Sequence, residues 1–345
     1  VAHSQLVTNA GGGPAQLVQN VLIGNGISAS NIQFQGNSYA IGYFDGTNCN
    51  IGLDEGIILT TGTIHNSSAM VAPEGPQGPN NSPSAGVDYG GPGDPNLTNL
   101  AGEDTYDAVL LEFDFVPMND TIQFNYVFAS EEYPEYVDQG YNDIFVFYIS
   151  GPGLGGTQNM ALIPGTSTPV TIDNINAGSN SAYYVANGDG STAPFNSSDY
   201  YVQYDGFTVP MTAMAEVQCG ETYHLKVALA DVGDGQYDSG IFLEANSFSA
   251  PTIANVENVT PVTQSGNTTT VHEGCDQIVL EFSRFGNLSD AMDVAINLSG
   301  SATEGADYSN VPSVVTFAPG QSTFQLQIDI FYDANSEGTE NIVLE

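Results

Sequence analysis

Hydrophobic and polar residues alternate with a period of two along most of the chain. The segment 109–116, VLLEFDFV, alternates large apolar residues with Glu112 and Asp114. The segment 121–128, TIQFNYVF, repeats this alternation, and 143–150, DIFVFYIS, is apolar on both faces. Alternation is typical of half-buried β-strands, and a continuous apolar run is typical of a strand inside a sandwich. The pattern predicts an all-β fold, an antiparallel β-sandwich of jelly-roll-like form.

Helical patterning is nearly absent. Pro14–Leu22 is the one segment that we expect to form a short helix. Two long loops rich in Gly, Pro, Asn and Ser lie between the predicted strands, at residues 72–105 and 178–198. Loops of this length in a compact domain are usually functional or held in place by the rest of the fold. We therefore expect long, functionally important loops on the sandwich.

A change in strand spacing divides the chain near residues 247–261, SFSAPTIANVENVTP. Beyond it, strand-like segments recur roughly every 10–15 residues, which is typical of an Ig-like sandwich. We predict two domains, residues 1–250 and residues 251–345. The sequence ends within a strand pattern, so we expect the second domain to be incomplete and further domains of the same chain to follow.

The charge is strongly one-sided. The chain has 40 acidic residues against 2 basic ones, Lys226 and Arg284, for a formal net charge of −38. Phosphate-rich partners would be repelled, so we expect no nucleic acid and no anionic membrane among the partners. No run of 18 apolar residues exists, so we expect no membrane insertion in this segment. The start, VAHSQLVTNAGGG, lacks the features of a signal peptide, which in a secreted protein has then been removed.

Carboxylates crowd into one turn between two hydrophobic strands, at residues 223–245. Asp231, Asp234 and Asp238 alternate there with glycines, which let backbone carbonyls turn inward. Calcium prefers six to eight oxygen ligands of both kinds, although Asp and Gly are also common turn residues. A second acidic group, at the end of one predicted strand and the start of another, favours the metal. We predict a calcium site formed by Glu131, Glu132, Asp143, Asp231 and Asp238.

Signatures of catalysis are absent from the sequence. It contains no GxSxG, HExxH or glycine-rich phosphate loop, and its four histidines are scattered. His224, in the middle of a predicted strand, is expected to be a packed side chain. Two carboxylates can serve a glycosidase, and Glu131 with Glu132 is such a pair, but 40 acids make a chance pair common. We expect a protein that is not an enzyme, with no catalytic residues and calcium as its sole cofactor.

The three cysteines fit no zinc spacing and no CxxC motif. They are either buried thiols or the cysteines of an oxidised, secreted protein. Cys49 and Cys219 each precede a predicted strand, and we predict a disulfide between them. Cys275 is then expected to pair with a cysteine beyond Glu345.

Several long motifs resemble the choice-of-anchor L domain. They are AIGYFDG, FNYVFASEEYPEYV, YNDIFVFYISGPG and TYHLKVALADVGDGQYDSGIFLEA, within roughly residues 5–250. The resemblance implies a large secreted or surface protein of a Bacteroidetes-type bacterium, exported by the type IX secretion system and anchored by varied C-terminal modules. Relatives from this bacterial group carry O-glycans at Asp-Ser/Thr-apolar motifs. Asp120-Thr121-Ile122 is one, which makes Thr121 a candidate O-glycan site.

The second domain resembles a Calx-beta module, an Ig-like sandwich. The motifs VHEG, ATEGADY, VTFAPGQ and DANSEGTENIVL carry this resemblance. Calcium-binding members have acids at positions that correspond here to Glu273, Asp307, Asp333, Glu337 and Glu340. Tyr332 stands where such members have a further aspartate, so the resemblance implies a weaker second calcium site.

Three function classes fit these observations. A non-catalytic cell-surface adhesin, calcium-stabilised and involved in attachment or gliding motility, agrees best with the resemblance. A carbohydrate-binding module of a secreted enzyme is the alternative, and a structural subunit of a surface filament is a third. The expected location is extracellular or at the cell surface. The expected partner is a surface polysaccharide or another extracellular ligand.

Overall fold

The computed structural model describes residues 6–24, 26–65, 75–82, 85–191, 198–250, 253–260, 264–265, 268–269, 271–274, 276–285, 291–309, 311–332 and 338–344. The chain divides into two compact units, Val1–Pro251 and Thr252–Glu345. The structure is mostly β, with antiparallel sheets packed as sandwiches, as the residue alternation predicted. Each unit is described by itself.

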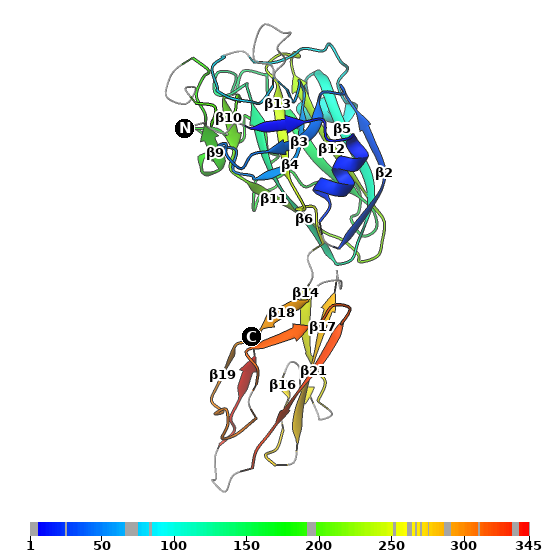
Figure 1. Cartoon of the computed structure of the whole chain (residues 1–345), viewed down its shortest axis with the longest axis vertical. Helices are drawn as coiled ribbons and strands as arrows, with labels where there is room; N and C mark the ends of the chain where they lie inside the picture. Colours follow the sequence, from blue (N-terminus) through cyan, green and yellow to red (C-terminus); the bar gives the residue numbers. More distant parts are fainter. Residues whose placement is uncertain are drawn as a thin grey trace. The chain divides into compact units, whose positions relative to one another are not determined.

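The first unit contains an eight-stranded sheet in the order β1-β3-β4-β13-β6-β10-β9, with β11 also paired to β6 (Figure 1). Its strands are β1 (Val7–Asn9), β3 (Ile41–Asp45), β4 (Glu55–Thr60), β13 (Ser239–Glu244), β6 (Thr121–Ser130), β10 (Gly206–Thr208), β9 (Tyr184–Ala186) and β11 (Met211–Glu216). All of these pairs are antiparallel.

A five-stranded sheet in the order β2-β5-β12-β7-β8 packs against it. Its strands are β2 (Ile27–Gln35), β5 (Thr105–Pro117), β12 (Tyr223–Val232), β7 (Ile144–Ser150) and β8 (Gln158–Asn159). Figure 1 shows β2, β5 and β12 side by side. Aromatic rings fill the space between the sheets: the ring centroids of Phe124 and Phe147 lie 4.7 Å apart, and those of Tyr126 and Phe147 lie 4.9 Å apart. Each such ring removes a large apolar area from water, which stabilises the fold by roughly 1.5–3 kcal/mol.

The outer faces of both sheets are also covered, which explains why 143–150 is apolar on both faces. Phe145 and Phe147 point into the core between the sheets. Ile144 and Val146 belong to a second cluster on the other face of the five-stranded sheet, together with Leu97. A third cluster, which includes Phe44, Tyr204, Phe207 and Phe242, covers the outer face of the eight-stranded sheet.

Short helical segments accompany the sheets. The predicted helix at Pro14–Leu22 is present as α1 (Pro14–Leu17), which continues into a π-helical segment, η1 (Val18–Leu22). The long loop 72–105 was expected to be irregular, and this is wrong for its last part, which forms α2 (Pro95–Ala101). Asp94, Pro95 and Gly102 form a standard set of helix boundaries that could have revealed α2: an N-cap acid, a proline at the first turn and a left-handed glycine at the end. A short 3₁₀ helix, η2 (Ser181–Tyr183), lies in the other long loop.

The second unit has its own core and several small antiparallel sheets, consistent with the predicted Ig-like sandwich. The strands are β14 (Ile253–Asn258), β17 (Gln277–Phe285) and β21 (Thr323–Asp329) in one sheet, β18 (Met292–Ala295) with β20 (Val314–Phe317), β19 (Leu298–Gly300) with β22 (Ile342–Leu344), and β15 (Gln264–Ser265) with β16 (Thr268–Thr269). Phe282, Phe317 and Ile328 lie at the centre of its core.

Asp94 provides a test of how α2 is held on the five-stranded sheet. Its carboxylate caps the backbone N–H groups of Asn96 and Leu97, and Lys226 Nζ lies 2.7 Å from its Oδ2. We expect Asp94→Ala to lower the free energy of unfolding by about 3 kcal/mol, because it removes the cap and leaves a largely buried ammonium with no carboxylate partner and only the Asn96 amide oxygen as acceptor. Asp94→Asn should lower it less, because asparagine still caps. Chemical denaturation measures both, and the exposed Glu103→Ala should stay within about 0.5 kcal/mol of the unmodified protein.

Candidate metal centre

Four strands from the two sheets end close together in the first unit. In the eight-stranded sheet, Ser239 at the start of β13 pairs with Ser130 at the end of β6. Glu131 and Asp238 are the next residues along these strands, and the Glu131 N–H donates to the Asp238 carbonyl at 3.1 Å. In the five-stranded sheet, the end of β12 meets the start of β7 in the same way, with Ala230 paired to Ile144.

Asp143 connects the two strand ends. Its Oδ1 accepts a hydrogen bond from Val232 N at 3.0 Å, and its Oδ2 accepts one from Ser239 Oγ at 2.6 Å. The first bond reaches β12 and the second reaches β13, which belong to different sheets. The structure thus brings together Glu131, Glu132, Asp143, Asp231 and Asp238, the five predicted ligands, which we call the acidic cluster.

The members of the acidic cluster are almost completely buried, with relative exposures of 0–3%. Within the part of the chain that the structure describes, no donor lies in hydrogen-bond geometry to either carboxylate oxygen of Glu131 or Asp231, or to one oxygen of Glu132. Gln203 lies near enough to Glu131, and Thr61 near enough to Asp231, to oppose the rise in the pKa of each carboxyl. Asp238 accepts a bond from Val87 N at 3.0 Å. An ionised carboxylate buried without a donor or a cation is so unfavourable that it takes up a proton or binds a positive ion.

The pKa values follow from this burial. Burial raises the pKa of Glu131 well above its ordinary value, and the charges of Asp205 and Asp238 add to the effect. Burial raises the pKa of Asp231 in the same direction, followed by the charges of Asp143 and Asp238. The pKa of Glu132 is raised by burial and then by the charge of Asp143. The pKa of Asp143 is also raised by burial, although its two hydrogen bonds oppose the shift.

One more carboxylate belongs to the group and was missed by the sequence reasoning. Asp205 is 1% exposed and directly precedes β10, whose Gly206 pairs with Ser130 of β6. Burial raises its pKa to about 8, against a hydrogen bond from Asn80. The strand that it precedes has only three residues and follows a tyrosine-rich segment, so the sequence shows no hydrophobic–polar alternation that would predict this strand. Asp234, from the same turn as Asp231, lies outside the acidic cluster and is partly exposed.

Glycine is required where the chain passes the cluster. A Cβ on Gly62 would lie 1.5 Å from Asp238 Oδ2, so any side chain there would collide with the carboxylate.

Among the described residues, no three His, Cys, Asp or Glu side chains already converge as a metal cage. The donor set nevertheless fits calcium, because it consists of buried oxygens and includes several without a donor. The ligands for one ion would come from Asp231, Asp143 and Glu132, with Asp238 and Glu131 beside them.

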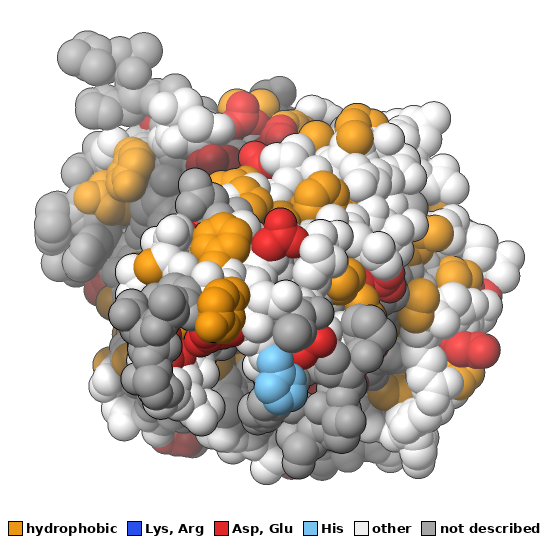
Figure 2. All heavy atoms as spheres, turned by 90° about the horizontal axis from the view of Figure 1, so that it is seen from below, with side chains coloured by type: hydrophobic (Ala, Val, Ile, Leu, Met, Phe, Trp, Pro, Cys, Tyr) orange, Lys and Arg blue, Asp and Glu red, His pale blue; other side chains and the backbone are white. Residues whose placement is uncertain are grey.

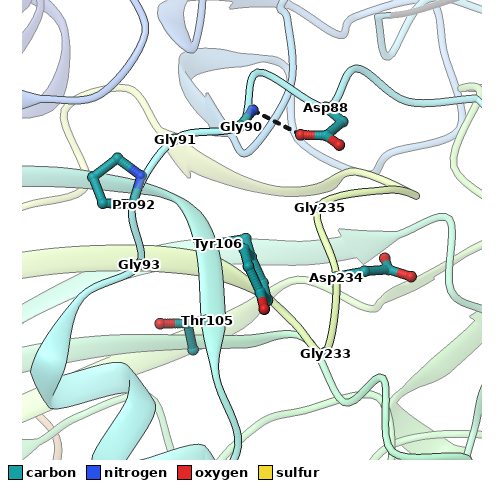
Figure 3. A pocket seen from close by; sticks show the side chains of 10 residues that line it. All are labelled: Asp88, Gly90, Gly91, Pro92, Gly93, Thr105, Tyr106, Gly233, Asp234 and Gly235. Carbon is teal, nitrogen blue, oxygen red and sulfur yellow. Dashed lines mark hydrogen bonds between the residues drawn. The ribbon is translucent and has the colours of Figure 1, made fainter.

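An open hollow of about 610 Å³ lies near the cluster. Two glycine-rich segments, residues 90–93 and 233–235, border it, and the Tyr106 side chain lies between them (Figure 3). Asp88 and Asp234 supply carboxylates at its edge, and Asp88 Oδ1 accepts from Gly90 N at 2.7 Å. An aromatic ring with nearby carboxylates is an arrangement suited to a polar, hydroxyl-rich ligand.

Comparison with known families agrees with the two units. A sequence model of the choice-of-anchor L domain matches residues 7–249. The chain belongs to the choice-of-anchor L domain family. A Calx-beta domain follows it and matches residues 257–345. No curated protein and no solved structure matched the chain. Both domain types are typical of secreted and surface proteins, and no helix among the described residues is long and apolar enough to cross a membrane.

The predicted ligands of the Calx-beta domain are only partly described. Glu273 and Glu340 are exposed, and Asp307 accepts a bond from Thr303 N at 2.6 Å. Backbone bonds from Gly274 N to Ile330 O and from Phe331 N to Asp307 O bring the first two acidic segments beside the strand end at Ile330. Asp333 and Glu337 lie outside the described residues. Calx-beta domains typically bind calcium, and binding at these residues stays a prediction.

The cysteine prediction is wrong for the choice-of-anchor L domain. Cys49 and Cys219 are both free thiols rather than a disulfide. Cys49 is buried beside Phe44 and Ile51 in the outer cluster, where burial raises its pKa to about 11. Cys219 is exposed in a turn whose Gly220 bonds to Pro117. The two cysteines precede strands, but they pack against different neighbours. Cys275 lies outside the described residues.

Two other predicted positions lie on the surface of the choice-of-anchor L domain. His224 is not packed in the core, because its side chain is 41% exposed. Its Nδ1 lies 2.9 Å from Asp114 Oδ1, and its Nε2 lies 3.1 Å from Glu112 Oε2. Thr121 begins β6 and is partly exposed, with its hydroxyl 3.4 Å from Asp120 Oδ1. Glycosylation of Thr121 stays a prediction.

The raised pKa values predict an unusual pH dependence in the absence of metal. Unfolded carboxylates lose their protons near pH 4, whereas folded Asp205 keeps its proton up to about pH 8. The folded state then binds more protons between these values, so stability falls as pH rises, by roughly 1.4 kcal/mol per pH unit for each such group. We expect the melting temperature in excess chelator to be higher at pH 5 than at pH 8. A melting temperature that rises over this range would contradict the burial of these acids.

Proposed function

We propose that this chain is part of a non-catalytic, calcium-stabilised surface protein that attaches cells to an extracellular ligand. One observation carries the calcium part: Glu131 and Asp231 are buried at the sandwich end with no donor to their oxygens among the described residues. Lys226 is the sole basic residue of residues 1–250, and it is bonded to Asp94 and Asn96. A bound cation is the remaining way to keep these carboxylates ionised at neutral pH.

Calcium suits the cluster better than magnesium. Calcium accepts many oxygens at variable distances, whereas magnesium requires a compact octahedron and gives up its water reluctantly. The acidic cluster offers several carboxylates from four strand ends, and the described residues form no tight preformed cage. An ion between β12, β7 and β13 would tie one sheet to the other, as the Asp143 bonds already do.

Attachment is supported by the family and by the surface charge. Both domain types are typical of secreted and surface proteins, where calcium is abundant. Acidic side chains lie scattered on the face in Figure 2, among described residues that show no lysine or arginine there. Such a surface disfavours anionic partners and allows neutral polysaccharides. We propose export by the type IX system and a role in adhesion or gliding on this basis.

A carbohydrate-binding module is a second candidate, and the hollow at Tyr106 favours it. A sugar ring can stack on an aromatic face while its hydroxyls bond to carboxylates and backbone amides. Asp88 and Asp234 provide such carboxylates around Tyr106. The adhesin and the binding module share this ligand class, and they differ in what the rest of the protein does.

Calcium removal tests the first proposal. At a Kd of roughly 10⁻⁴ M and roughly 10 mM calcium, binding should stabilise the fold by about 2.7 kcal/mol. We expect excess chelator at pH 7.5 to lower the melting temperature and magnesium to restore little of it. Asp231→Asn should reduce the calcium response, while Asp120→Asn, on an exposed turn, should leave it intact. Superimposable melting curves with chelator and with calcium would rule out the metal.

A glycan array tests the second candidate. The 345-residue chain, labelled and applied in calcium, should bind a subset of neutral polysaccharides. Tyr106→Ala should reduce that binding at least tenfold, because the aromatic face on which the sugar ring stacks is lost. Tyr200→Ala removes an exposed tyrosine elsewhere and serves as the control. Equal loss in both variants, or none in either, would exclude the hollow as the binding site.

A further inference from the structure

Three carboxylates stand in a row at one end of the eight-stranded sheet. Ser130 of β6 pairs with Ser239 of β13 on one side and with Gly206 of β10 on the other. The residues next to these positions are Glu131, Asp238 and Asp205. Neighbouring strands lie about 4.8 Å apart, so each acid is one strand from the next. The charges of Asp205 and Asp238 are accordingly the strongest acting on Glu131.

The row and the rest of the cluster lie on different faces of the sheet. Ala129 and Phe207 pack in the outer cluster. Glu131 lies two residues after Ala129 and Asp205 two residues before Phe207, each one residue beyond its strand, and this spacing of two assigns both acids to the outer face. Asp143 instead bonds between the sheets, to Ser239 and Val232. We call Glu131 and Asp205 the outer group, and Asp143, Asp231 and Glu132 the inner group. Asp238 is shared, since its charge acts on both Glu131 and Asp231.

A buried amide adds a further oxygen beside the outer group. Gln203 is 0% exposed, and its side-chain amide lies close enough to Glu131 to oppose the rise in the pKa of that carboxyl. Its Nε2 donates to Asn80 Oδ1 at 3.2 Å and to Ser82 O at 3.0 Å. Asn80 in turn donates to Asp205 and to the Asn187 carbonyl, which fixes its own orientation. Flipping Gln203 would place its oxygen against two acceptors.

In this orientation, Gln203 Oε1 has no donor in hydrogen-bond geometry among the described residues. The same is true of both carboxylate oxygens of Glu131. The nearby hydroxyls do not supply one: Tyr204 donates to Thr60 Oγ1, and Thr60 donates to the Ser239 carbonyl. A buried set of acceptors with no donor has the chemistry of a cation site.

We infer that the choice-of-anchor L domain binds two calcium ions, one at the inner group and a second at the outer group, where Glu131, Asp205 and Gln203 Oε1 supply oxygens and Asp238 lies between the ions. This inference rests on the proposed calcium function and specifies its stoichiometry. One divalent ion would leave four of the six buried carboxylate charges without a partner, whereas two ions leave two. Two ions on opposite faces of one sheet end also explain why the acids divide into two groups.

Ion counting on variants tests the inference. Bound calcium is counted by native mass spectrometry on the 345-residue chain, with Asp205→Asn, Asp143→Asn and the double variant. Any ion in the Calx-beta domain is common to all variants and cancels in the differences. We expect each single variant to lose one ion and the double variant to lose two. Glu131→Gln should match Asp205→Asn, because both residues belong to the outer group. Each substitution removes a buried charge, so the variants should melt no lower than the unmodified protein in chelator.

The outcomes separate the two claims. If Asp205→Asn and Glu131→Gln keep the full count while Asp143→Asn loses one ion, the second site is excluded and the proposed function stands. If the double variant loses one ion in total, a single shared ion is present and the inference is overturned. If no variant loses an ion, the proposed calcium function fails as well.

Discussion

The burial of carboxylates in a chain that has almost no basic side chains governs this structure. Residues 1–250 contain one basic residue, Lys226, and it serves Asp94 on the outer face of the five-stranded sheet. Among the described residues, Val232 and Ser239 donate hydrogen bonds to Asp143, and Val87 donates one to Asp238. What remains is a group of acids that protons or metal ions must neutralise, and at neutral extracellular pH calcium is the ion that the oxygen ligands fit best.

This constraint links the fold to its proposed role. Both sheets end at the acidic cluster, so an ion there holds the two layers together at the end that carries the loops near Tyr106. Outside the cell, where calcium is plentiful, the domain would be rigid and ready to bind. Without calcium, the same acids would hold protons at low pH, and the fold would weaken as they lost those protons with rising pH. In the proposed function, calcium is a structural condition for attachment.

The sequence predicted the parts of this arrangement that depend on local periodicity. The alternation in 109–116 and 121–128 gave the sandwich, and the acids at the strand ends gave the cluster, because strand ends in one sheet meet. Prediction from the sequence failed for residues whose position depends on contacts with distant parts of the chain. Asp205 joins the cluster only through the pairing of a three-residue strand with β6, and Cys49 and Cys219 share a local context but not a location. The helix α2 was missed for a different reason, because its capping residues were read as part of a loop.

Anomalous diffraction from crystals grown in calcium, with data collected at a long wavelength, tests the central claim most directly. The account predicts an anomalous peak within coordination distance of Asp231 and Asp143, with carboxylate oxygens drawn toward it. It also predicts a peak beside Glu131 and Asp205. Well-ordered carboxyl groups that hydrogen-bond to one another or to water, with no anomalous peak at the sandwich end, would contradict it.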